Sequence, residues 1–204
     1  MKISSYIIMV FFVFVIGCTL VLFISAKGHE KDNVLTNKEY LLGDADINVI
    51  VAEPEALIRI HTFDTSSVSI HYPMNERVPE NFYRVSNDTL YVSKMVLQNQ
   101  ESRRVDIYIK DVALVIAKKN SDVRITSFFS DSLTINAEQA RVEINNASLE
   151  EISIQASHSN ISMYSNKVAS VFAKIENESI FRTDSKEVGK IDVEKDQSSR
   201  YNVH

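Results

Sequence analysis

Residues 114–154 read LVIAKKNSDVRITSFFSDSLTINAEQARVEINNASLEEISI, and short segments in this stretch alternate apolar and polar residues. Alternation with period two is typical of β-strands with one buried face. The pattern also returns at a fixed distance. Apolar pairs recur every nineteen residues, at Leu114 and Ile116, Leu133 and Ile135, and Ile152 and Ile154.

The repeat continues to the C-terminus, with steps of nineteen that widen to twenty and twenty-one at the end. Nineteen of the twenty column positions are apolar; Arg182 is the exception, and we expect Phe181 beside it to turn inward through a bulge. The first columns continue at Val171 and Ala173, then Ile191 and Val193. The second columns are Val123 and Ile125, Val142 and Ile144, Ile161 and Met163, Ile180 and Arg182, and Tyr201 and Val203.

A fixed offset between short strands predicts an all-β, single-stranded β-solenoid (β-helix) with rungs of about nineteen residues. Each rung would hold two or three strands, rungs would stack about 4.8 Å apart, and column residues would fill the core. Polar clusters such as 118–122 would form the corners. A β-sandwich also uses short alternating strands, but it has no reason to keep one offset.

The domain is expected to span 38–204, with residues 38–110 as less regular early rungs and excursions at 73–81 and 98–103. Further strands are predicted at Ile47–Val51, Leu57–Ile60, Val68–Ile70, Leu90–Val92 and Val105–Ile109.

The N-terminal segment predicts a single transmembrane anchor within residues 1–26, followed by a polar linker at 27–37. Residues 6–24 are apolar except for Gly17 and Thr19. A helix of this length spans about 29 Å, close to the roughly 30 Å of a bilayer core, so residues 6–25 would contact the membrane. Residues 27–204 contain no cysteine and carry 21 − 27 = −6 charges, which favours an extracytoplasmic domain.

Two other interpretations of this segment remain open. Residues 15–18 end in Cys18 and resemble a bacterial lipobox, although an apolar run follows where a lipoprotein has a polar tether. A cleaved signal peptide would need a shorter apolar core and a small-residue exit.

Composition excludes several function classes. With 22 basic and 27 acidic residues the net charge is −5, which argues against nucleic-acid binding. A single cysteine excludes an intramolecular disulfide framework and a cysteine-built zinc site. We predict no cofactor, no metal and no catalytic residue.

Three groups of residues are candidate sites. His61 and His71 flank a turn that contains Asp64, and these three side chains could ligate a metal ion. Two surface histidines are the simpler interpretation. Carboxylates at corner positions could pair for acid–base catalysis, although aspartate also caps turns. These carboxylates are Asp111, Asp131, Glu150 and Glu151. The aromatic candidates for a sugar platform are Phe128, Phe129, Phe172, Phe181 and Tyr164, the last expected to point outward.

Three segments carry a resemblance: INVIVAEPEALIRIHTFDTSSVSIHY at 47–72, YRVSNDTLYVSK at 83–94 and RVDIYIKDVALVIAKKNSDVRITS at 104–127. Followed by repeating strands, they resemble bacterial putative auto-transporter adhesin proteins with a head GIN domain, over roughly residues 45–204. The resemblance implies a β-solenoid exported from a bacterial cell, without site residues or cofactor. Family members are often glycine-rich at corners, whereas this chain has only Gly43 and Gly189 after the linker.

Together these observations predict a single-pass protein of the bacterial cell membrane whose C-terminal domain, periplasmic or extracellular, is a non-enzymatic, adhesin-like envelope scaffold with a protein or glycan partner. The alternatives are a glycan- or cell-wall-binding module, which needs an exposed aromatic and polar face, and a polysaccharide-lyase-like enzyme. The domain is expected to be a monomer, because residues 186–204 carry eight charges and rung 147–165 only two. Charges on a terminal rung oppose edge-to-edge growth.

Overall fold

The structure is a computed structural model that describes residues 11, 13–21, 35–43, 45–73, 76–97, 102–184 and 187–203. The chain divides into two compact units, residues 1–36 with 72–76, and residues 37–71 with 77–204. The second unit contains most of the β-structure.

Helical residues in the described part of the N-terminal segment are 11 and 13–21. No helix within the described residues is long and apolar enough to cross a membrane. Much of the predicted anchor at 1–26 and most of the linker at 27–37 lie outside the described residues. The anchor therefore stays a prediction.

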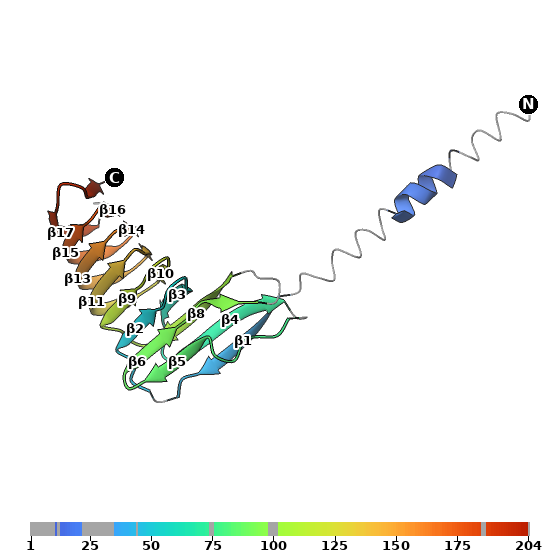
Figure 1. The fold of residues 1–204 in the computed structure, drawn as a ribbon, viewed down its shortest axis with the longest axis horizontal. Helices are drawn as coiled ribbons and strands as arrows, with labels where there is room; N and C mark the ends of the chain where they lie inside the picture. Colours follow the sequence, from blue (N-terminus) through green and yellow to red (C-terminus); the bar gives the residue numbers. More distant parts are fainter. Residues whose placement is uncertain are drawn as a thin grey trace, which may run out of the picture. The chain divides into compact units, whose positions relative to one another are not determined.

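The described β-structure forms two sheets (Figure 1). Sheet A has the strand order β1-β4-β8-β3-β10-β12-β14-β16-β18, with β7 paired to β8, and sheet B has the order β17-β15-β13-β11-β9-β2-β6-β5. The early strands are β1 (Leu35–Leu41), β2 (Val49–Ala52), β3 (Leu57–Thr62), β4 (Ser67–Pro73), β5 (Tyr83–Ser86), β6 (Thr89–Val92), β7 (Met95–Val96) and β8 (Ser102–Ile109). The later strands are β9 (Leu114–Ala117), β10 (Asp122–Thr126), β11 (Phe129–Glu138), β12 (Arg141–Asn145), β13 (Ser148–Ser157), β14 (Asn160–Tyr164), β15 (Lys167–Glu176), β16 (Ile180–Thr183), β17 (Val188–Lys195) and β18 (Arg200–Val203).

From β9 onward the chain alternates between the two sheets, and each strand pairs in parallel with the strand two places later (Figure 1). The predicted β-solenoid is confirmed, with two strands in each rung and about four turns. The step of nineteen residues is observed where Val123 pairs with Val142 and Val142 with Ile161. All three side chains are fully buried, so this column forms the core as the repeat predicted.

Two predicted core assignments are wrong by one residue. Val115 and Ala117, rather than Leu114 and Ile116, are fully buried, and Val115 pairs with Ile135 at a step of twenty. Near the C-terminus, Phe181 pairs with Ile161, again at a step of twenty, so Phe181 faces the core in place of Ile180. The inward direction of Phe181 is confirmed, but β16 stays in regular register and contains no bulge.

Corner length explains both differences. Two residues separate the buried Ala137 from Ala140, whereas three separate Ala117 from the buried Ser121. The corner at 176–178, before β16, also has three. Each additional corner residue shifts the following strand by one, and a shift of one exchanges the two faces of a strand.

The corners adopt left-handed backbone without glycine. Positive φ values recur every nineteen residues at Asn120 (59°), Gln139 (51°), His158 (51°) and Asn177 (56°). Left-handed backbone is uncommon outside glycine but several-fold enriched at asparagine and histidine. Buried serines support these corners, because the Ser159 N–H donates to Ser179 Oγ at 3.1 Å and the Ser179 N–H to Ser199 Oγ at 3.2 Å. Polar residues thus occupy the corner positions at which members of the family that the sequence resembles often have glycine.

The early strands form one end of the stack. The rung β2–β3 lies between β9–β10 on one side and β6 and β8 on the other. Beyond them, β5 pairs antiparallel with β6, and β4 pairs antiparallel with β8. At the other end, β17 and β18 are the edge strands of the described sheets. That these edges do not self-associate, and that the domain is a monomer, stays a prediction.

The register can be tested with two phenylalanines on consecutive strands, Phe172 on β15 and Phe181 on β16. Phe181 is 0% exposed and Phe172 is 39% exposed. Phe181→Ala should therefore lower the free energy of unfolding by about 3–5 kcal/mol, because it leaves a cavity in the core. Phe172→Ala should cost less than about 1 kcal/mol. Urea unfolding of both variants measures this, and equal losses would contradict the register.

Candidate functional site

The outward face of sheet B between β9 and β17 is the candidate binding surface, and we call it the groove face. Because the strands pair in parallel, outward side chains line up in columns across neighbouring strands. One column runs Ile116, Asn136, Gln155, Lys174 and Glu194; a second runs Leu114, Thr134, Ser153, Phe172 and Asp192; a third includes Glu138, Ser157 and Glu176.

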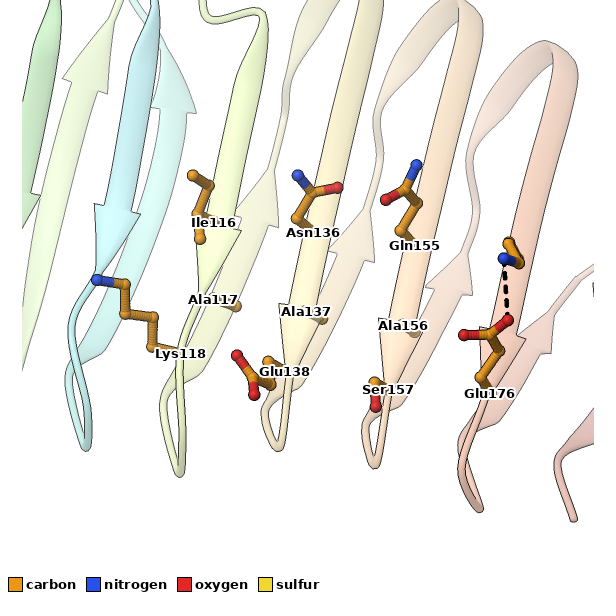
Figure 2. A pocket seen from close by; sticks show the side chains of 11 residues that line it. Ile116, Ala117, Lys118, Asn136, Ala137, Glu138, Gln155, Ala156, Ser157 and Glu176 are labelled. Carbon is orange, nitrogen blue, oxygen red and sulfur yellow. Dashed lines mark ion pairs between the residues drawn. The ribbon is translucent and has the colours of Figure 1, made fainter.

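Three adjoining hollows lie on the groove face. The largest has a volume of about 410 Å³ and extends over β9, β11, β13 and β15 (Figure 2). Ala117, Ala137 and Ala156 line it although their side chains are buried, so the hollow lies over the backbone between outward side chains of neighbouring columns. Two further hollows, of about 210 and 230 Å³, share Lys174 with the first. The groove face therefore carries three shallow hollows that meet at Lys174.

Polar side chains line the largest hollow in two rows. Asn136 and Gln155 lie in one row, and Glu138, Ser157 and Glu176 lie in another (Figure 2). Lys174 Nζ lies 2.9 Å from Glu176 Oε1. The hydrogen bond that Lys174 donates to Glu176, together with the charge of that carboxylate, raises the pKa of Lys174 above its ordinary value, so the lysine stays protonated. Asn136 Oδ1 is buried and accepts no hydrogen bond from the described residues.

The four carboxylates that are candidates for catalysis lie outside the hollows of the groove face. Asp111 Oδ1 accepts hydrogen bonds from Ser130 Oγ at 2.7 Å and from the Val112 N–H at 2.8 Å, so it caps a turn beside Ser130 rather than Asp131. Asp131 and Glu150 are exposed on neighbouring strands. None of the four carboxylates lines one of the three hollows.

The histidines lie on the outward face of sheet A, around a carboxylate that sequence analysis missed. His71 Nε2 is 3.7 Å from Asp106 Oδ2, and Arg59 Nη1 is 3.6 Å from Asp106 Oδ1. The His61 ring stacks on Tyr108 at a centroid distance of 5.3 Å. Asp106 is brought there because β8 inserts between β3 and β4. The described residues contain no group of three or more side chains that could hold a metal ion.

Arginines dominate the rest of that surface, which we call the arginine face and define by Arg59, Arg104, Arg124, Arg141, Arg182 and Arg200. Arg104 Nη2 lies 3.4 Å from Asp122, and Arg124 Nε lies 3.5 Å from Asp122 and 3.7 Å from Glu143. Burial lowers the pKa of Arg104 below its ordinary value, and the charge of Arg124 adds to this effect. The cations are thus close enough to repel one another.

The aromatic candidates separate into two groups. Phe128 and Phe181 are fully buried and belong to the core, whereas Phe129, Phe172 and Tyr164 are exposed, Tyr164 outward as predicted. Phe172 lines one hollow of the groove face, and Lys190 Nζ lies 5.5 Å from its ring centroid. Phe172 is therefore the exposed aromatic side chain that lines a hollow, whereas Phe129 is exposed on β11 and lines none of the three hollows.

No protein-family model matches the sequence, and no curated protein matches it. Among solved structures, a putative adhesin from Bacteroides fragilis NCTC 9343 aligns with a TM-score of 0.52 at 13% identity, covering 85% of this chain and 99% of that one. A putative adhesin from Parabacteroides merdae ATCC 43184 aligns with a TM-score of 0.35 at 11% identity, covering 84% and 97%. A putative lipid binding protein from Parabacteroides distasonis ATCC 8503 gives 0.36 at 10%, with the same coverage. The first likeness confirms, at the level of the fold, the resemblance to putative adhesins.

The environment of His61 predicts a dependence of stability on pH. Burial lowers the pKa of His61 below 6.5, and the charge of Asp106 only partly opposes this. The folded chain favours the neutral His61 ring. The contribution of this neutral ring to the free energy of unfolding is therefore present above pH 6.5 and is lost as the pH falls from 6.5 through the lower pKa of the folded chain. Between about pH 7.5 and about pH 5.5, the melting temperature should fall further for the parent chain than for His61→Gln. His158→Gln, at an exposed histidine, is the control and should follow the parent; identical curves for all three would refute the assignment.

Proposed function

We propose that this chain is a non-enzymatic, adhesin-like module of the bacterial cell envelope that binds an extended partner along the groove face. The observation that carries this proposal is the row of three adjoining hollows across β9 to β17, which share Lys174. Surface hollows with a few fixed polar groups are the usual form of a binding site.

The chemistry of the groove face supports binding rather than catalysis. A catalytic site needs an acid, a base or a nucleophile that converge on one reacting atom. Here Lys174 and Glu176 pair with each other. The carboxylates considered for a lyase-like enzyme line none of the hollows; they are Asp111, Asp131, Glu150 and Glu151. Amide and hydroxyl groups such as Asn136, Gln155 and Ser157 make up much of the remaining polar lining. The likeness in fold to a putative adhesin agrees with this interpretation.

A glycan is the occupant that one specific observation favours. Phe172 is 39% exposed and lines the same hollow as Gln155 and Asp192. A sugar ring can pack its apolar face on such an aromatic side chain, while amide and carboxylate groups bind its hydroxyls. The glycan-binding module is therefore the second candidate, and a protein partner would not require Phe172.

The groove face can be blocked without changing the core. Gln155→Tyr places a bulky ring in two of the hollows, and tyrosine is well tolerated on a strand surface. Retention of the full-length chain on immobilised cell-wall polysaccharide should fall roughly tenfold, the equivalent of about 1.4 kcal/mol.

Ser148→Tyr is the matched control, because Ser148 is exposed on the same strand but lines none of the hollows. It should bind as the parent chain does. Equal losses in both variants, or none in either, would contradict binding at the groove face. Phe172→Ala separates the two candidates, since only glycan binding should weaken.

The attachment to the envelope rests on the apolar run at 6–24. Protease added to intact spheroplasts should degrade the domain at 38–204, and a chain that lacks residues 1–26 should leave the membrane fraction. Cys18→Ser should stay in the membrane, because a spanning helix needs no lipid on Cys18. Release of Cys18→Ser would instead show a lipoprotein, and protection of the domain would overturn the proposed topology.

A further inference from the structure

We draw no further inference here: the strongest candidate, the surface patch where the start of β11 meets the end of β3 and leaves the side chains of Phe63 and Phe129 exposed, carries none because nothing in the structure shows what covers it.

Discussion

The whole structure depends on the parallel hydrogen bonding between successive rungs. From β9 onward each strand pairs with the strand two places later, as when Ile125 pairs with Ile144 and Ile144 with Met163. This pairing forces every side chain into a column with its counterparts about 4.8 Å away. An apolar residue must therefore face an apolar residue in the next rung, and a corner must stack on a corner. The register between rungs is set by the number of residues in each corner.

The same constraint shapes the outer surfaces. Outward residues are also aligned in columns, so residues of neighbouring rungs line the same hollow or place their charges side by side. Asn136 and Gln155 become neighbours in the groove face although nineteen residues separate them. Arg124 and Arg182 come to share a column in the same way. Two sheets with different outer columns allow one small domain to present two chemically distinct surfaces.

Much of this could be read from the sequence, because local alternation and a constant period both survive in one dimension. Period-two patterns located the strands around Val51, Ile60 and Ile107, and the nineteen-residue offset identified the solenoid and the columns through Val142 and Ile152. The outward direction of Tyr164 followed from the same alternation. In these parts, the repeat and the burial of apolar side chains require the same register.

Only the tertiary structure decided which corners hold an additional residue, which strands lie beside one another at the start, and where charge collects. A period of nineteen and a period of twenty place apolar residues equally well when both Leu114 and Val115, or both Ile180 and Phe181, are apolar. The contact between His71 and Asp106 requires β8 to insert between β3 and β4, and no sequence period records an insertion. Alternation along the chain is a local property, whereas pairing across the sheets depends on hydrogen bonds between distant residues, which form only when the chain is folded.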